Sequence, residues 1–228
     1  HYVNTLTHEL KSPLTAIQAS AELLKEDLPL EDQQQFATHI HEQSHRLKTL
    51  IDRMLLLTRL EKSQHQVEPQ YFNLSELIQQ VLDQHASQIQ QQQIQCLLDI
   101  EPNCMISADR FWIQQTLANV LDNALDFTPS TDKIFFKLIH LDNKKIQISL
   151  FNEGASIPNY ALPQIFDTYF SLPRPSNQQR SSGIGLSIVK QVIEQHHGQI
   201  KIENIQANHI TKLIPHTSGV LVSIELPL

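Results

Sequence analysis

The chain has 228 residues, of which 40% are hydrophobic and 18% are charged, with 5 Gly and 11 Pro. This composition is typical of a chain that buries one or two ordinary cores, and it excludes collagen-like structure and wholesale disorder. With a formal charge of −7, the chain is not expected to bind nucleic acid. Binding to phosphates needs a surplus of Lys and Arg clustered on one face.

The two cysteines, Cys96 and Cys104, are too few for a disulfide-stapled scaffold. We expect both to be core residues in a reducing compartment. The sequence has no apolar run of the roughly 18 residues that a membrane span needs, and it has no signal peptide. It begins at His1 rather than Met, so we expect a fragment of a longer protein, attached to a membrane only through segments outside this chain.

Residues 3–61 have the spacing of two amphipathic helices. Apolar residues recur every three or four positions from Val3 to Leu24 and again from Phe36 to Leu57, which is the seam of a coiled coil. The segment 28–32 contains Pro29 and predicts a short turn between the helices. A single hairpin leaves half of each apolar stripe uncovered, so we expect residues 1–64 to form a homodimer as a four-helix bundle.

The chain after residue 64 changes character. Residues 63–72 have neither helix nor strand periodicity and contain Pro69, which predicts a linker over 65–72 and a second domain over 73–228. In that domain we expect helices over 73–89, 111–127 and 183–196, and strands over 94–100, 104–106, 133–141, 145–152, 200–205 and 220–226. This order of elements predicts an α+β domain with a largely antiparallel sheet.

His8 lies on the face of the first helix opposite the apolar seam, and Ser12 follows on the same face four residues later. Pro13 crowds the carbonyl group of Glu9, so the helix should bend beside His8. An isolated histidine in this setting is most simply a solvated side chain. The surrounding string, His8-Glu9-Leu10-Lys11-Ser12-Pro13-Leu14-Thr15, closely resembles the phosphoacceptor motif of sensor histidine kinases.

Two further segments resemble motifs of this family and follow in the family's order. Residues 117–124, LANVLDNA, are similar to its asparagine box, and residues 183–189, GIGLSIV, are similar to its second glycine box. Asn119 and Asn123 share the side of a predicted helix opposite its apolar residues, where a solvated face is the simpler interpretation. The resemblance implies that Asn123 binds Mg²⁺, a cation that prefers oxygen ligands.

Gly183 and Gly185 open a predicted helix, where unpaired backbone donors and the helix dipole favour phosphate. Arg174 and Arg180 lie in the preceding loop and are suited to phosphate oxygens, although a loop arginine is commonly just solvated. The segment 163–170, PQIFDTYF, resembles the phenylalanine box, which in the family leads into a lid over the nucleotide; a helix anchored by aromatic core residues is the alternative.

Residues 152–158 match the first glycine box of the family in outline. Asn152 continues the alternating row of Ile146, Ile148 and Leu150, so its side chain should point to the buried side of the sheet. It would equally serve the turn that follows the strand. We include Asn152 and Gly154 among the candidate nucleotide-binding residues.

The chain departs from the family pattern at four positions that bear on nucleotide affinity. Asn152 stands for the usual Asp, Ser156 for the second Gly of the first glycine box, Asp126 for a basic residue, and Ser181 for the first Gly of a triple.

The resemblance implies a helical-hairpin phosphotransfer domain followed by a two-layer α/β sandwich of the Bergerat type that binds ATP and Mg²⁺. It implies that ATP phosphorylates His8, with Glu9 holding or deprotonating the imidazole. The phosphoryl group would then pass to an aspartate of a response-regulator receiver domain.

Ser12 would position a water for hydrolysis of that partner's phosphoaspartate. A phosphatase-dominant regulator and a kinase-inactive nucleotide-binding scaffold of the same fold are the alternatives. We expect the chain to be the cytoplasmic portion of an inner-membrane sensor.

Overall fold

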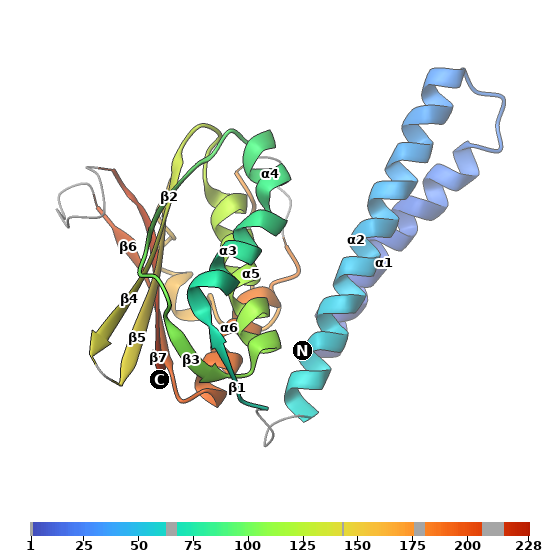
Figure 1. Ribbon diagram of the computed structural model, residues 1–228. Coiled ribbons are helices and arrows are strands. Elements are labelled where there is room, and N and C mark those ends of the chain that lie inside the picture. Colours follow the sequence, from blue (N-terminus) through green and yellow to red (C-terminus); the bar gives the residue numbers. More distant parts are fainter. Residues whose placement is uncertain (1, 63–67, 143, 176–180, 207–216) are drawn as a thin grey trace. The chain divides into compact units, whose positions relative to one another are not determined.

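The computed structural model describes residues 2–62, 68–142, 144–175, 181–206 and 217–228, with side chains from Leu10 onward in the first helix. The chain divides into two compact units, His1–Glu61 and Lys62–Leu228 (Figure 1). The first unit is helical, and the second contains all the described strands.

The first unit consists of helices α1 (Tyr2–Leu23) and α2 (Leu30–Lys62). At the predicted turn, the backbone N–H of Gln33 donates to the carbonyl oxygen of Pro29 at 3.1 Å. The buried Ser20 links the two helices, because its Oγ lies 2.9 Å from Nδ1 of His39. These contacts agree with the predicted hairpin.

Among the described residues, no helix is both long and apolar enough to cross a membrane.

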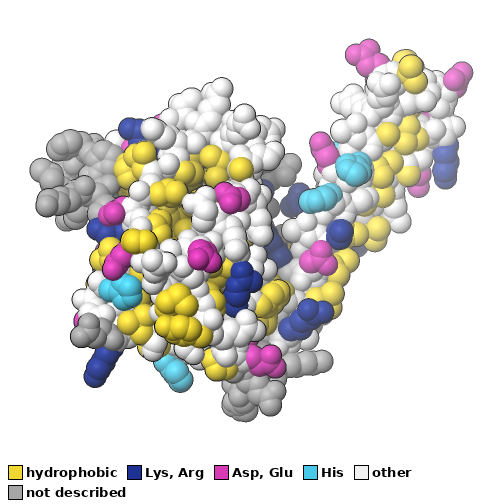
Figure 2. Space-filling view, in the orientation of Figure 1, with side chains coloured by type: hydrophobic (Ala, Val, Ile, Leu, Met, Phe, Trp, Pro, Cys, Tyr) yellow, Lys and Arg dark blue, Asp and Glu magenta, His cyan; other side chains and the backbone are white. Residues whose placement is uncertain are grey.

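Large apolar side chains remain exposed along this hairpin. Leu14 is 47% exposed, Ile51 43% and Leu55 54%, and Figure 2 shows hydrophobic side chains following the hairpin as a stripe. These three residues flank the predicted coiled-coil seam. A surface of this kind is what a second hairpin would cover in a four-helix bundle.

The second unit is built on a five-stranded sheet in the order β2-β4-β5-β7-β6 (Figure 1). The strands are β2 (Gln95–Ile100), β4 (Lys133–Asp142), β5 (Lys145–Glu153), β6 (Gln199–Ile205) and β7 (Gly219–Pro227). The β2–β4 pair is parallel and the other three pairs are antiparallel, so the predicted largely antiparallel sheet is confirmed. Strands β1 (Gln70–Asn73) and β3 (Met105–Ala108) form a separate antiparallel pair.

Helices α3 (Leu74–Gln84), α5 (Arg110–Phe127) and α6 (Gly185–Gln195) cover one face of the sheet (Figure 1). The short helix α4 (Ala86–Gln91) follows α3, and a 3₁₀ turn spans Leu162–Gln164. One core joins the helices to the sheet, and its members include Leu77, Val81, Leu117, Leu121, Val189, Ile193, Phe136, Ile148 and Ile224. The two-layer α/β sandwich is therefore confirmed.

Three predicted boundaries differ from the structure. The helix predicted over 73–89 is broken at His85, whose φ of −97° and ψ of 2° end α3. Residues 70–72, predicted as part of the linker, belong to β1, and Pro69 comes just before this short strand, where a missing N–H is tolerated. The last helix begins at Gly185 rather than Gly183, because Gly183 has a positive φ of 64°.

Candidate nucleotide-binding site

Helix α5 has a polar face that contains Asn119 and Asn123. Asp109 begins the helix by accepting hydrogen bonds from the N–H groups of Phe111 and Trp112, as an N-cap residue does. Asn119 and Asn123 follow at one-turn spacing on the half-exposed side. Nδ2 of Asn123 donates to the carbonyl oxygen of Asn119 at 2.9 Å. The amide oxygen of Asn123 is therefore the atom left to bind a ligand.

The asparagine and second glycine motifs meet in space. A Cβ on Gly185 would lie 3.2 Å from Oδ1 of Asn119. This distance is tighter than a normal van der Waals contact, so the missing side chain lets the N-terminus of α6 approach the polar face of α5. Helices α5 and α6 pack against each other, which fixes this junction.

Gly183 supports the same junction from the other side. Its φ of +64° is a conformation that glycine adopts at little cost. A Cβ there would lie within 2.7 Å of backbone atoms of Tyr169 and Phe170, and the N–H of Tyr169 donates to the Gly183 carbonyl oxygen at 2.8 Å. The segment predicted as the phenylalanine box thus contacts the second glycine motif through its backbone.

Asn152 lies at the end of β5 with its side chain on the buried side of the sheet, as the alternation predicted. It is 5% exposed, and its Nδ2 donates to the carbonyl oxygen of Glu153 at 3.2 Å. The amide oxygen is then the group available to a base. Gly154 lies next to it, where a Cβ would be 2.8 Å from the carbonyl oxygen of Phe127.

Two residues beside Asn152 were not predicted from the sequence, namely Glu153 and Gly219. Glu153 is buried, and its two carboxylate oxygens accept hydrogen bonds from the Lys133 backbone N–H (3.0 Å) and the Thr217 hydroxyl (2.9 Å). A Cβ on Gly219 would lie 2.0 Å from the carbonyl oxygen of Asn152. Both residues fix the end of β5, and the only signal for Glu153 is its place between a buried strand and a glycine.

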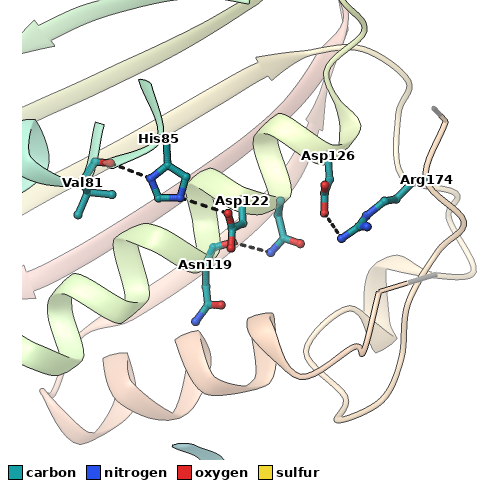
Figure 3. A network of polar contacts seen from close by, with 7 residues as sticks. Val81, His85, Asn119, Asp122, Asp126 and Arg174 are labelled. Carbon is teal, nitrogen blue, oxygen red and sulfur yellow. Dashed lines mark hydrogen bonds and ion pairs between the residues drawn. The ribbon is translucent and has the colours of Figure 1, made fainter. Parts of the chain in front are cut away.

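Asp126, which stands where the family has a basic residue, holds a cation from another segment. Its Oδ2 lies 2.6 Å from Nη2 of Arg174 (Figure 3), and the two side chains are partly exposed, Arg174 by 26% and Asp126 by 19%. Asp126 comes one turn after Asn123 on the same side of α5. The structure therefore brings the guanidinium of Arg174 to the end of the polar face.

Asp122 of α5, one residue before Asn123, pairs with His85, which lies between α3 and α4. Nε2 of His85 is 3.2 Å from Oδ1 of Asp122, and its Nδ1 is 2.7 Å from the carbonyl oxygen of Val81 (Figure 3). The hydrogen bond to Asp122 raises the pKa of His85 above its usual value, against the opposing effect of partial burial. The break between α3 and α4 places this ring, and periodicity alone gave no signal for it.

Four other predicted site residues are Ser12, His8 and Glu9, which belong to the first unit, and Arg180. Ser12 is exposed on α1, and the side chains of His8 and Glu9 on the same helix lie outside the described residues. Arg180 also lies outside them. Helix α5 connects the other motifs, because Asn119 lies against Gly185, Asp126 pairs with Arg174, and Phe127 lies beside Gly154.

Two family models match the chain. The model of the histidine kinase-, DNA gyrase B- and HSP90-like ATPases matches residues 108–228, and that of the His Kinase A (phospho-acceptor) domain matches residues 2–63. The sensor protein CreC of Escherichia coli (strain K12) is 35% identical over 99% of this chain and 44% of its own length.

The adaptive-response sensory kinase SasA of Synechocystis sp. is 31% identical over 87% of this chain and 54% of its own length. The chain thus spans about half the length of the curated relatives it matches. Among solved structures, histidine kinase ThkA in complex with response regulator protein TrrA aligns with a TM-score of 0.77 at 25% identity, covering 99% of this chain and 60% of that chain. The chain belongs to the sensor histidine kinases and contains their phosphoacceptor domain followed by their ATPase domain.

Proposed function

We propose that the chain is the catalytic core of a dimeric sensor histidine kinase that transfers the γ-phosphoryl group of Mg-ATP to His8. The observation that carries this proposal is the 3.2 Å approach between Oδ1 of Asn119 and the Cβ position of Gly185. It joins two motifs that are far apart in the sequence at a helix N-terminus, where unpaired N–H groups bind phosphate.

The phosphate end of the nucleotide would lie against the N-terminus of α6 and the polar face of α5. Gly183 and Gly185 let the backbone come close to the phosphate oxygens, since neither carries a side chain. Arg174, held by Asp126 at 2.6 Å, supplies a guanidinium at the same end. A charge-assisted hydrogen bond from this group would bind a phosphate oxygen.

Mg²⁺ fits the residues present on α5. The amide nitrogen of Asn123 is used in a bond to Asn119, so its amide oxygen, a type of ligand that Mg²⁺ accepts, remains available. When bound, Mg²⁺ supplies positive charge to the phosphates during transfer. Asn123 would contribute one ligand, and phosphate oxygens and waters would complete the shell.

The base end of the nucleotide would be read by Asn152. Its amide oxygen is available to accept a hydrogen bond from the exocyclic amine of adenine, because its nitrogen is engaged with Glu153. Gly154 carries no side chain at this position, where a Cβ would lie 3.9 Å from Nδ2 of Asn152. A neutral acceptor is weaker than a carboxylate, so the proposed site recognises adenine with modest affinity.

At His8 the imidazole nitrogen would attack the γ-phosphorus. The new N–P bond forms as the P–O bond to ADP breaks, and the electron pair of that bond leaves on the β-phosphate oxygen. Glu9, the next residue on α1, would hold the ring or accept its proton, which keeps one nitrogen available as a nucleophile.

The hairpin would dimerise through its exposed apolar residues Leu14, Ile51 and Leu55. A response-regulator receiver domain is the proposed phosphoryl acceptor, and the complex of ThkA with TrrA supports a partner of this class. Ser12, exposed four residues after His8, supports an additional phosphatase reaction in which its hydroxyl positions water. We place the chain on the cytoplasmic side of an inner-membrane sensor.

The test is incubation of the chain with γ-labelled ATP and Mg²⁺, followed by acid and by alkali. We expect label that is lost in acid and kept in alkali, because phosphohistidine has this stability. His8→Gln should abolish the labelling, whereas His41→Gln, on α2, should not. Label that persists in His8→Gln would refute the assignment of the phosphoacceptor.

A further inference from the structure

Three side chains that the proposed kinase reaction does not use converge at the far end of the sheet from Asn152. They are Glu101, just after β2, Cys104, just before β3, and His140, near the end of β4. One ligand atom from each lies within 4.8 Å of those of the other two. A carboxylate, a thiol and an imidazole together form a donor set typical of a transition-metal site.

The distances suit a tetrahedral ion. Sγ of Cys104 lies 3.5 Å from Nδ1 of His140, and a Zn²⁺ ion with usual bond lengths separates its sulfur and nitrogen ligands by about 3.5 Å. Oε1 of Glu101 lies 2.9 Å from the same nitrogen. A bound ion would require about 3.4 Å there, so the carboxylate needs to move by only about half an ångström.

An ion pair alone does not explain why both Glu101 and Cys104 approach Nδ1 of His140. A hydrogen bond between His140 and Glu101 accounts for the carboxylate, but it does not account for a buried thiol directed at the same nitrogen. The thiol sulfur of Cys104 therefore adds a third possible ligand atom to the two of the ion pair.

The ligands are already held by other contacts. The second carboxylate oxygen of Glu101 accepts from the backbone N–H of His140 at 2.8 Å, which directs the first oxygen toward the ring. The backbone of Cys104 is held on both sides, since its N–H donates to Oγ of Ser75 (3.1 Å) and its carbonyl oxygen accepts from Leu74 (2.7 Å). Second contacts of this kind orient the ligands of metal sites.

An ion could reach this group from solvent. The side chain of His140 is 33% exposed and that of Glu101 43%, whereas Cys104 is fully buried behind them. We propose that Glu101, Cys104 and His140 form a site for one Zn²⁺ ion, with water as the fourth ligand. On binding, the thiol releases its proton and the ring carries its own proton on Nε2.

The ion would stabilise the domain rather than take part in phosphoryl transfer. Ile134 pairs with Asn152 at one end of β4, and His140 lies six residues further along, about 20 Å away at the usual rise of a strand. The ion would fasten the 101–104 turn, and with it the start of α3, to β4. A ligand that binds only the folded state raises its melting temperature.

Titration of the reduced full chain with Co²⁺ is the first test. We expect one ion per chain, with the visible spectrum of tetrahedral cobalt and a thiolate-to-cobalt charge-transfer band. Cys104→Ser should lose that band, and Cys96→Ser, which removes the other, half-buried cysteine, should keep it. Bound cobalt without the band would overturn the proposal.

Competition with a chromophoric chelator then measures Zn²⁺ affinity in variants of the exposed ligands. We expect His140→Gln and Glu101→Gln to weaken binding at least about tenfold, and excess Zn²⁺ to raise the melting temperature of the unaltered chain by about 5 °C. His197→Gln, an exposed histidine after α6, is the control for adventitious binding. Equal affinity in all these variants would show that His140 and Glu101 form only an ion pair. These two surface substitutions keep the test decisive if Cys104→Ser does not fold.

Discussion

The guanidinium of Arg174 lies 2.6 Å from the carboxylate of Asp126, so an acidic residue of α5 holds a cation that comes from a segment about fifty residues later in the chain. In the family that this chain resembles, a basic residue of the helix itself is common at this position. The ion pair thus places a positive charge beside this position of α5, although the charge comes from Arg174 and not from the helix. The carboxylate of Asp126 neutralises part of that charge.

Arg174→Gln and Asp126→Asn should change nucleotide affinity in opposite directions. The first removes the proposed charge-assisted bond to phosphate, and we expect Mg-ATP to bind about five- to tenfold more weakly. The second removes a negative charge beside the phosphates, and we expect tighter binding by a few-fold. Calorimetric titration measures both, with Arg110→Gln, at the exposed start of α5, as the control. Equal losses in both variants would mean that Asp126 acts chiefly by positioning Arg174.

Asn123→Ala should abolish the Mg²⁺-dependent part of ATP binding. The substitution removes the proposed metal ligand, while its bond to the Asn119 carbonyl oxygen lies within one helix turn and contributes little to the fold. We expect ATP affinity in Mg²⁺ to fall at least tenfold, with an unchanged melting temperature. Titrations with and without Mg²⁺ test this, and Gln115→Ala, two turns earlier on α5, is the control. If Mg²⁺ still tightens ATP binding in Asn123→Ala, the metal ligand lies elsewhere.

Asn152→Asp should tighten ATP binding and lower the free energy of unfolding of the protein. A carboxylate makes a stronger bond to the adenine amine, worth several-fold in affinity, whereas the carbonyl group of guanine would face it unfavourably. Without nucleotide, the new carboxylate would be buried and would face the Glu153 carbonyl oxygen, which now accepts a hydrogen bond from Asn152. Leaving such groups unsatisfied costs about 1–3 kcal/mol.

Titration with ATP and with GTP, together with the free energy of unfolding in urea, tests this pair of effects. Asn159→Asp introduces the same charge at an exposed position and serves as the control. Equal gains for ATP and GTP would show that Asn152 does not contact the base.

The pair of His85 and Asp122 should make stability depend on pH. Because the folded state raises the pKa of His85 above its unfolded value of about 6.5, protonation favours folding. The contribution is fully present below about pH 6.5, and it is lost as pH rises through the folded-state pKa. Asp122 is 38% exposed at its side chain, so we expect less than about 1 kcal/mol.

Urea unfolding of the unaltered chain and of His85→Gln, across about pH 5.5 to 8.5, measures this contribution. The difference in free energy between the two proteins should shrink toward high pH. His197→Gln, at an exposed position after α6, is the control for removal of a histidine. A difference that is constant with pH would contradict the prediction.

The parts of the site that the sequence predicts are those set by local periodicity. Helical spacing puts Asn119 and Asn123 on one side of α5, and strand alternation turns Asn152 inward, because both patterns follow from the geometry of a single element. The family motifs add the glycines. These features need no knowledge of how distant segments pack.

The parts that the sequence does not predict all depend on contacts between distant segments. Nothing local to Asp126 indicates that it pairs with Arg174, and His85 reaches Asp122 only because α3 ends at the ring. The same is true of Glu153, whose partners come from the start of β4 and from the residues before β7. A pattern along the chain carries no information about such tertiary pairs.

The position of β5 between β4 and β7 has a consequence for the order in which parts of the chain can fold during synthesis. Asn152 pairs with Ile134 on one side and with Val220 on the other, and Val220 lies in the last strand of the chain. Contacts between segments so far apart form slowly. During synthesis from the N-terminus, the hairpin bearing His8 is complete long before β7 leaves the ribosome, so a nascent chain carries the proposed phosphoacceptor while it still lacks a strand of the proposed adenine site.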